Sequence, residues 1–282
     1  MRDTAPDLDL GDGLVARHVP GPGERVLWIH GYTMDSSIWR ELWGLLPAWD
    51  HLGLDLPGHG ASRPIHDAED LPALAGRVGE LALRHGVRHV CALSFGTMLA
   101  VEMAIRHPGA FDTVVLAAPA LAGGPQDAAV AQRYRELALL YRQKGSGPHM
   151  AELWMRSPPH TFKGIDARPQ VREHMERLAT RHPWRELEGL AMLRLTNPPQ
   201  TEDQVRTISS EVLVLVGEDD MPAFRQCADM IAGWVPSGRR VDLAGLGHLC
   251  CLEAPEIAAP LIHDHLAMER PFDGGYETGR TR

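Results

Sequence analysis

The residues that decide the fold are Val90-Cys91-Ala92-Leu93-Ser94-Phe95-Gly96. An apolar run ends at Ser94, and the apolar helical pattern of residues 98–105 follows it. A run that is apolar on both faces is typical of a strand covered by helices on both sides of a sheet. Small residues two positions before and after Ser94 relieve crowding at a tight strand-to-helix turn, which would hold the serine clear of the backbone. The stretch therefore predicts a strand, a sharp turn and a helix, with Ser94 as a candidate nucleophile.

Other apolar runs also end in turn residues, so the unit around Ser94 recurs along the chain. Helical patterns lie between the early runs, and this alternation is typical of βα units stacked around a parallel sheet. We expect an α/β fold with a mostly parallel central sheet and helices on both of its faces. Polar residues should gather at the carboxyl ends of the strands, where open α/β sheets bind ligands. The further runs are residues 26–29, 52–54, 114–116, 212–216 and 240–243.

Residues 121–209 break this alternation, because they contain no strand-like run. Apolar residues recur there at helical spacing instead. We expect residues 121–209 to form an inserted helical lid on a core built from residues 1–120 and 210–268. The polar tail, residues 269–282, has too little apolar surface to pack and is expected to be disordered. The three helical stretches of the insertion are residues 130–141, 150–154 and 171–179.

The composition excludes several classes of partner. The 282-residue chain has 28 Lys and Arg against 37 Asp and Glu, a formal net charge of −9, which disfavours a nucleic-acid partner. No apolar run approaches the roughly 20 residues that span a bilayer, and the acidic N-terminus is unlike a secretory signal. The four cysteines lack metal-ligand spacing, and a disulfide framework is not expected in a chain with this much core. We predict a cytoplasmic protein without a nucleic-acid or membrane partner.

Three side chains near predicted strand ends could act together. Ser94 needs a base to remove its proton, and the base needs an acid that fixes its tautomer and stabilises the imidazolium. His248 follows the last apolar run and is the candidate base, whereas Asp220 is the candidate acid, with Asp219 and Glu218 as competitors. Taken singly, a serine there can simply cap a helix, and acids there can simply be turn residues. The order of the three along one edge of a sheet favours a shared site.

Two backbone amides could stabilise a negatively charged oxygen beside Ser94. The Phe95 N–H follows the serine and points toward a helix N-terminus. The Tyr32 N–H comes directly after another strand end, His30-Gly31. We predict that these two amides form an oxyanion hole.

Four motifs follow one another along the chain: Trp28-Ile29-His30-Gly31-Tyr32, Asp55-Leu56-Pro57-Gly58-His59-Gly60-Ala61-Ser62, the Ser94 turn, and Gly217-Glu218-Asp219-Asp220 with Gly247-His248. In this order they resemble the α/β-hydrolase fold superfamily over roughly residues 25–268. The Ser94 turn departs from the family pattern G-x-S-x-G only in that Ala92 replaces the first glycine. The family's catalytic acid usually lies three residues after a strand-end glycine, which selects Asp220 over Asp219. We interpret the second motif, residues 55–62, as structural, with Asp55 bonding locally.

The resemblance implies a cofactor-free, metal-free serine hydrolase of the serine-nucleophile branch with a helical cap. Ser94, Asp220 and His248 would be its catalytic triad. Relatives that hydrolyse epoxides or remove halide use an aspartate nucleophile, so Ser94 excludes their chemistry. Carboxylesterases, thioesterases and lactonases are similar, and the expected partner is a small to medium hydrophobic acyl compound. The oligomeric state stays open.

Two other functions remain open at this point. The same triad could serve a cofactor-free lyase, cyclase or C–C bond hydrolase, or a receptor-like protein could retain the pocket with little turnover. The insertion must bury apolar side chains against the sheet edge, so some of Met150, Trp154 and Trp184 should line the substrate pocket as well as the lid core. We expect the insertion to govern substrate choice rather than the chemical step.

Overall fold

The computed structural model describes residues 7–66, 69–189 and 191–268. Its centre is an eight-stranded sheet with the strand order β1-β2-β4-β3-β5-β6-β7-β8. The first two strands pair antiparallel with each other, β2 pairs antiparallel with β4, and all other neighbours are parallel. The prediction of a mostly parallel sheet is confirmed. The strands are β1 (Asp7–Gly11), β2 (Leu14–Val19), β3 (Arg25–Ile29), β4 (Asp50–Leu54), β5 (Val87–Leu93), β6 (Thr113–Ala117), β7 (Glu211–Gly217) and β8 (Gly238–Leu243).

Helices cover both faces of this sheet, because alternate residues of each buried strand point to opposite sides. In β5, Val90 and Ala92 join the apolar cluster on one face, whereas Cys91 and Leu93 join the cluster on the other. The first face is covered by α2 (Leu71–Arg84), α3 (Phe95–Arg106), α8 (Glu202–Val205) and α9 (Pro222–Trp234). The second is covered by η1 (Ser36–Trp39), α1 (Arg40–Leu45), α10 (Cys250–Glu253) and α11 (Pro255–Leu266).

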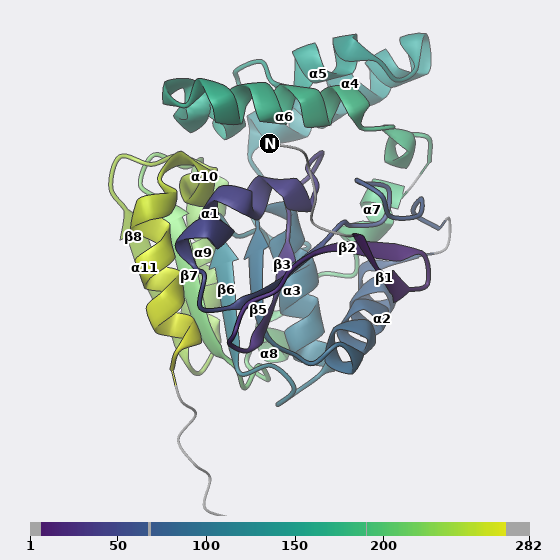
Figure 1. The fold of residues 1–282 in the computed structure, drawn as a ribbon. Helices are drawn as coiled ribbons and strands as arrows, with labels where there is room; N and C mark the ends of the chain where they lie inside the picture. The colour runs from purple at the N-terminus through teal and green to yellow at the C-terminus, as the bar shows by residue number, and fades with distance from the viewer. Residues whose placement is uncertain (1–6, 67–68, 190, 269–282) are drawn as a thin grey trace, which may run out of the picture.

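Residues 122–200, which we call the inserted segment, connect β6 to β7. Within its described part, residues 122–189 and 191–200, this segment contains no strand. Three of its helices lie across one end of the molecule, beyond the sheet (Figure 1), and they coincide with the three predicted helical stretches. Its elements are α4 (Ala128–Lys144), α5 (Pro148–Trp154), η2 (His160–Ala167), α6 (Pro169–Arg181), η3 (Arg185–Leu187) and α7 (Ala191–Leu195).

The two ends of the inserted segment are fastened to each other. The Gln200 N–H donates to the Ala122 carbonyl oxygen at 2.9 Å, and the Ala122 N–H donates to Gln200 Oε1 at 3.1 Å. Glycine is required next to this stem, because a Cβ on Gly123 would lie 2.6 Å from the Cβ of Pro199. Gln200 Nε2 also donates to the Met98 carbonyl oxygen of α3 at 2.8 Å. The stem therefore holds both ends of the segment against the core.

The antiparallel hairpin of β1 and β2 is not among the predicted strands. Asp12 and Gly13 form its two-residue turn, and both have positive φ, +57° and +70°. Two successive positive φ values are typical of a type I′ turn, which Asp-Gly favours. The apolar residues Leu8, Leu10 and Leu14 alternate with polar ones around this turn. The Asp-Gly turn and the alternation therefore indicate a hairpin in the sequence, although its strands are short and partly polar.

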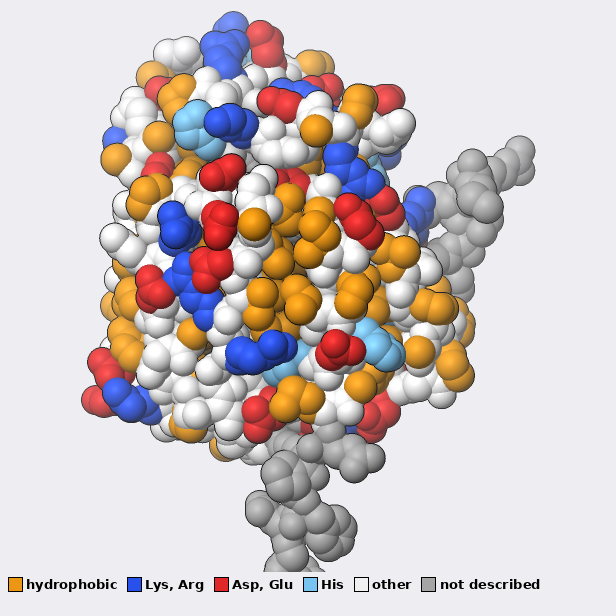
Figure 2. All heavy atoms as spheres, turned by 90° about the vertical axis from the view of Figure 1, so that its left-hand side faces the viewer, with side chains coloured by type: hydrophobic (Ala, Val, Ile, Leu, Met, Phe, Trp, Pro, Cys, Tyr) orange, Lys and Arg blue, Asp and Glu red, His pale blue; other side chains and the backbone are white. Residues whose placement is uncertain are grey.

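One face of the molecule carries apolar side chains on its surface. Figure 2 shows them gathered on the side that lies at the left of Figure 1, where α11 and β8 are found. The exposed large apolar side chains include Leu45 of α1 and Ile257 of α11. Among the described residues, no helix is long and apolar enough to cross a membrane. Leu45 and Ile257 belong to helices of 6 and 12 residues whose other faces join the apolar cluster on the sheet.

Candidate active site

Ser94 lies at the turn from β5 into α3, in a backbone conformation that few residues adopt. Its φ is +51° and its ψ is −121°, and such conformations cost roughly 1–3 kcal/mol unless the surroundings hold them. The Ser94 N–H donates to the Ala117 carbonyl oxygen at 2.9 Å. Gly96 is needed next to the turn, because a Cβ there would lie 2.5 Å from the His30 carbonyl oxygen. The Ser94 side chain makes no capping hydrogen bond to α3, so its hydroxyl is free for another partner.

That partner is His248, which in turn contacts Asp220. Ser94 Oγ lies 2.8 Å from His248 Nε2, and His248 Nδ1 lies 2.9 Å and 3.1 Å from the two carboxylate oxygens of Asp220. Because a carboxylate only accepts hydrogen bonds, Nδ1 carries a proton and Nε2 accepts from the serine hydroxyl. This chain of groups can take a proton from Ser94 while Asp220 compensates the charge on the imidazolium.

Burial distinguishes Asp220 from its two competitors in the sequence. Glu218 and Asp219 are exposed, whereas Asp220 is buried and also accepts from the Met221 N–H at 2.7 Å. The turn begins at Gly217, where a Cβ would lie 2.1 Å from the carbonyl oxygen of Leu246. Glycine therefore lets the turn after β7 pack directly on the turn after β8 that carries His248.

The Tyr32 and Phe95 amides lie on two segments that meet beside Ser94. Phe95 is the first residue of α3, so its N–H has no acceptor inside the helix. The residue before Tyr32 packs on the serine, since a Cβ on Gly31 would lie 3.4 Å from the Cβ of Ser94. Within the described part of the chain, neither amide donates to a protein acceptor. Both N–H groups could therefore bind an oxygen atom held next to Ser94.

The loop that carries Tyr32, residues 30–34, is fastened to the core by two buried histidines. His30 accepts from the Leu56 N–H at 3.0 Å, and His59 accepts from the Thr33 N–H at 3.2 Å. The other nitrogen of each ring donates to a backbone carbonyl oxygen, at 2.7 Å and 3.0 Å. Burial lowers the pKa of both histidines. Each ring is thus neutral, with one donor and one acceptor nitrogen that hold the loop.

Asp55 holds its own loop locally, as the sequence predicts, and it also bonds to the start of η1, 19 residues earlier in the chain. Its carboxylate accepts from the Ser36 N–H at 2.8 Å and from the Ala61 N–H at 2.9 Å. Gly60, with φ +51°, leaves room for this carboxylate, because a Cβ there would lie 2.0 Å from Asp55 Oδ2. The contacts confirm a structural role for Asp55.

Glu253 is a residue that the motifs do not point to, and it contacts the backbone on both sides of His248. Its Oε2 accepts from the Gly247 N–H at 2.6 Å, and its Oε1 accepts from the Leu249 N–H at 2.9 Å. Burial raises the pKa of the Glu253 carboxyl group. Since the N-cap of α10 is Leu249, Glu253 lies four residues after it, one position beyond the glutamate of a capping box. The capping-box spacing therefore does not point to Glu253 in the sequence.

The predicted pocket residues Met150, Trp154 and Trp184 are all buried. Trp154 and Trp184 pack edge-on against Tyr32, with ring centroids 5.4 Å and 6.0 Å apart. Met150 belongs to the same apolar cluster as both tryptophans. None of the three is among the residues that line four cavities in the described part of the chain. Their part in a substrate pocket stays a prediction.

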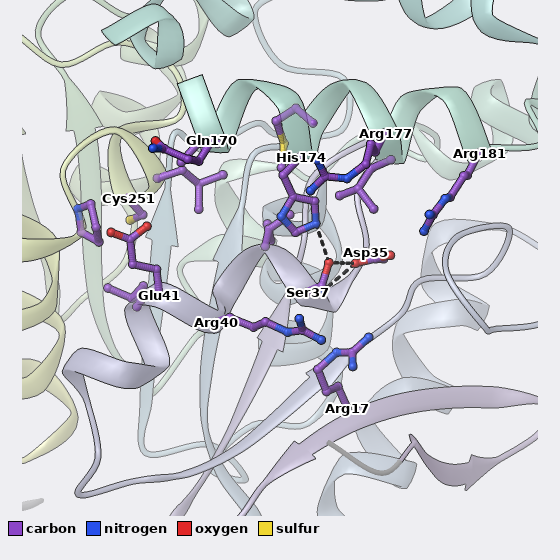
Figure 3. A pocket seen from close by; sticks show the side chains of 17 residues that line it. Arg17, Asp35, Ser37, Arg40, Glu41, Gln170, His174, Arg177, Arg181 and Cys251 are labelled. Carbon is purple, nitrogen blue, oxygen red and sulfur yellow. Dashed lines mark hydrogen bonds between the residues drawn. The ribbon is translucent and has the colours of Figure 1, made fainter. Parts of the chain in front are cut away.

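A separate polar cleft of about 380 Å³ lies between α6 and the segment formed by η1 and α1 (Figure 3). His174 Nε2 lies 2.8 Å from Ser37 Oγ at its centre. Burial lowers the pKa of His174, and nearby guanidinium groups lower it further. The described residues contain no group of three or more His, Cys, Asp or Glu that could hold a metal ion. Arginines line the cleft from both sides, namely Arg17, Arg40, Arg177 and Arg181.

The family model described as "Alpha/beta hydrolase family" matches residues 26–260. The chain belongs to the alpha/beta hydrolase family. A thermophilic esterase from Thermogutta terrifontis shares its fold, with a TM-score of 0.74 and 24% identity over 90% of this chain and 93% of that one.

Curated relatives of this α/β hydrolase fall into two groups by coverage. A pimeloyl-[acyl-carrier protein] methyl ester esterase from Stenotrophomonas maltophilia is 28% identical over 91% of this chain and 98% of its own length. An AB hydrolase superfamily protein from Gibberella zeae is 38% identical over 95 residues, which are 32% of this chain and 33% of that protein. The chain thus spans about a third of the length of some relatives that it matches.

Proposed function

We propose that the chain is a serine hydrolase that cleaves an ester, thioester or lactone of a small to medium hydrophobic substrate. The hydrogen-bonded chain from Ser94 through His248 to Asp220 is the observation that carries this proposal. The Tyr32 and Phe95 amides beside Ser94 add the donors that acyl transfer requires. Membership of the family and the esterase descriptions of similar proteins support ester hydrolysis at a general level.

The first half of the reaction forms an acyl-enzyme. Ser94 Oγ attacks the carbonyl carbon, its proton passes to His248 Nε2, and the carbonyl electron pair moves onto the substrate oxygen. The Tyr32 and Phe95 amides bind that oxyanion. When the carbonyl reforms, the bond to the leaving group breaks, and the leaving oxygen or sulfur takes the proton from His248.

The second half repeats these steps with water. His248 accepts a proton from a water molecule whose oxygen attacks the acyl carbon, and the tetrahedral oxyanion again occupies the same two amides. Collapse breaks the bond to Ser94 Oγ, which recovers its proton from His248. A free acid is released, and Asp220 holds the same nitrogen of His248 throughout.

The apolar inserted segment supports a hydrophobic acyl group as the substrate. We assign Met150, Trp154 and Trp184 to the wall of the acyl site, because the two tryptophans contact Tyr32. Hydrophobic pockets discriminate one methylene group by about 10-fold to 200-fold in kcat/KM. A series of esters that differ only in acyl length therefore reports the size of the site.

Ser94→Ala tests the proposal. We expect the variant to keep its fold, to resist labelling by a fluorophosphonate, and to lose several orders of magnitude in ester turnover. Ser209→Ala is the matched control, since Ser209 is an exposed serine outside the site, and it should be labelled and turn over like the wild type. Equal turnover in folded Ser94→Ala would disprove the serine hydrolase.

The same measurement separates the alternatives. Intact mass reports whether the fluorophosphonate reacts at Ser94, and a panel of esters, thioesters and lactones reports turnover. A covalent adduct without turnover of any panel member would favour a lyase, a C–C bond hydrolase or a receptor-like protein on the same triad. Turnover that depends on Ser94 would leave the serine hydrolase as the function.

A further inference from the structure

The 30–34 loop is held from the inserted segment as well as from the core. The Tyr32 hydroxyl donates to Glu186 Oε1, and Trp154 Nε1 donates to Thr33 Oγ1 at 2.8 Å. Both contacts are buried, and they join residues 154 and 121 positions apart in the chain. The inserted segment is thus bonded to the same loop whose Tyr32 amide we propose as an oxyanion donor.

Glu186 is placed to hold the Tyr32 side chain in one position. Its own side chain is 1% exposed, and its Oε1 also accepts from His182 Nε2 at 2.9 Å. A buried carboxylate needs hydrogen-bond donors, and Tyr32 and His182 are those donors. Burial and the Glu186 carboxylate raise the pKa of Tyr32 well above its usual value, so the hydroxyl keeps the proton that it donates.

Aromatic packing restricts Tyr32 further. The ring centroids of Phe95 and Trp154 lie 6.0 Å and 5.4 Å from that of Tyr32, at tilted and edge-on angles. Such contacts fix the direction of the ring, whereas the hydrogen bond to Glu186 fixes how far the side chain reaches. Because the side chain and the amide of Tyr32 share one Cα, holding the hydroxyl limits the positions that the amide can take.

We propose that Glu186 is a positioning residue that acts through the Tyr32 hydroxyl to fix the Tyr32 amide in the oxyanion site. The inference rests on the proposed function, because it requires Ser94 to attack a carbonyl group. It gives the inserted segment a part in the chemical step, in addition to substrate choice. Glu186 also lines a cleft of about 850 Å³ together with Gly58 and Pro64, so the contact lies at a seam between the core and the inserted segment.

Three substitutions test this role. Tyr32→Phe removes the donor, Glu186→Ala removes the acceptor, and Glu186→Gln keeps an oxygen that can accept. The measurements are kcat, KM and the inhibition constant of a trifluoromethyl ketone, whose carbonyl carbon Ser94 attacks to form a bound tetrahedral oxyanion. We expect Tyr32→Phe and Glu186→Ala to lower kcat about 10-fold to 100-fold, less than the loss of a whole oxyanion donor, with little change in KM.

The ketone should lose affinity by the same factor as kcat, and Glu186→Gln should recover most of the loss. Tyr141→Phe is the matched control, since Tyr141 donates to Glu188 in a solvent-exposed pair on the same inserted segment. It should leave kcat, KM and the inhibition constant unchanged. If Glu186→Ala only destabilised the fold, kcat per folded enzyme and ketone affinity would both keep their wild-type values.

The double variant Tyr32→Phe/Glu186→Ala provides the decisive comparison. If Glu186 acts through Tyr32, the double variant is no slower than the slower single variant, whereas multiplied losses would overturn the proposal. Wild-type kcat and ketone affinity in folded Tyr32→Phe would also overturn it, even if Glu186→Ala fails to fold. Absence of Ser94-dependent turnover in the wild type would instead overturn the proposed function.

Discussion

His248 and His51 are buried to nearly the same degree, 2% and 1% exposed, but their partners differ in charge. His248 lies between the Asp220 carboxylate and the Ser94 hydroxyl. His51 accepts from Trp28 Nε1 at 3.1 Å and donates to the Leu46 carbonyl oxygen at 3.0 Å, so both of its partners are neutral. Burial lowers the pKa of His51 to about 4.

The contrast shows that two equally buried histidines can suit different roles, because one has a charged partner and the other has only neutral partners. A carboxylate offsets the charge of an imidazolium, whereas an indole and a carbonyl group offset little of the free energy that burying this charge costs. His51 therefore fixes its surroundings as a neutral ring. His248 has the surroundings of a general base.

The largest loss of activity should come from replacing Asp220, the charged partner of His248. Asp220→Asn gives His248 a neutral partner of nearly the same shape, and we expect kcat to fall about 10⁴-fold with the fold retained. Asp219→Asn is the control, because Asp219 is exposed and His248 Nδ1 contacts the carboxylate of Asp220 instead. Ester kinetics of both variants measure the effect. A larger loss in Asp219→Asn would move the acid to position 219.

The neutral histidine can be tested by stability. The unfolded chain protonates His51 near its usual pKa of 6.5, whereas the folded protein resists protonation until about pH 4. The stability that neutral His51 contributes is therefore complete above pH 6.5 and is lost as the pH falls toward 4. At 1.36 kcal/mol per pH unit, the gap corresponds to roughly 3 kcal/mol of unfolding free energy.

His51→Gln removes this titration and keeps one acceptor for Trp28 and one donor for Leu46. Between pH 7 and pH 4 we expect the free energy of unfolding to decrease less in the variant than in the wild type. The difference should be at most roughly 3 kcal/mol. Urea unfolding at several pH values measures the difference, with ester turnover at pH 7 unchanged. Parallel stability curves for the two proteins would show that His51 is not held neutral.

The smallest expected effect concerns how His248 is held. Glu253→Gln replaces one of two acceptors for the Gly247 and Leu249 amides with a donor, so the backbone around His248 should shift slightly. We expect kcat to fall roughly 10-fold, as a misplaced catalytic group would cause. Loss of turnover as severe as that of Asp220→Asn would instead give Glu253 a direct part in the proton transfer.

The stability of Glu253→Gln should depend on pH in a defined direction. Burial raises the pKa of Glu253 above its usual 4.5, so the folded state binds this proton more tightly than the unfolded state. Stability is then lost as the pH rises from 4.5 through the folded pKa. Glu253→Gln lacks this titration. Its free energy of unfolding, measured with urea, should therefore rise relative to that of the wild type over that pH range.

The sheet and the meeting of Ser94, Asp220 and His248 could be predicted from sequence because parallel strands end at one edge. Turn residues after apolar runs mark that edge without any knowledge of long-range contacts. The catalytic roles of the three residues stay predictions, although the structure brings their side chains within hydrogen-bonding distance.

Glu186 and Glu253 could not be selected in the same way. The partner of Glu186 lies 154 residues earlier in the chain, and no local pattern shows which buried side chains of the inserted segment meet the 30–34 loop. Helical spacing predicts that Trp154 is buried, but it does not show that the indole donates to Thr33. Side-chain pairs across two layers depend on packing, which periodicity does not encode.

The stem of Ala122 and Gln200 holds the two ends of the inserted segment together. The segment therefore connects β6 to β7 in the way that one surface loop would. Ala117 and Leu215 pair across β6 and β7 on either side of it, whatever its length. Because loop-closure entropy grows with the logarithm of length, doubling such a loop costs only about 0.6 kcal/mol. Descendants of this gene could therefore lengthen, trim or exchange the segment for a new ligand while inheriting the strand pairing beneath it unchanged.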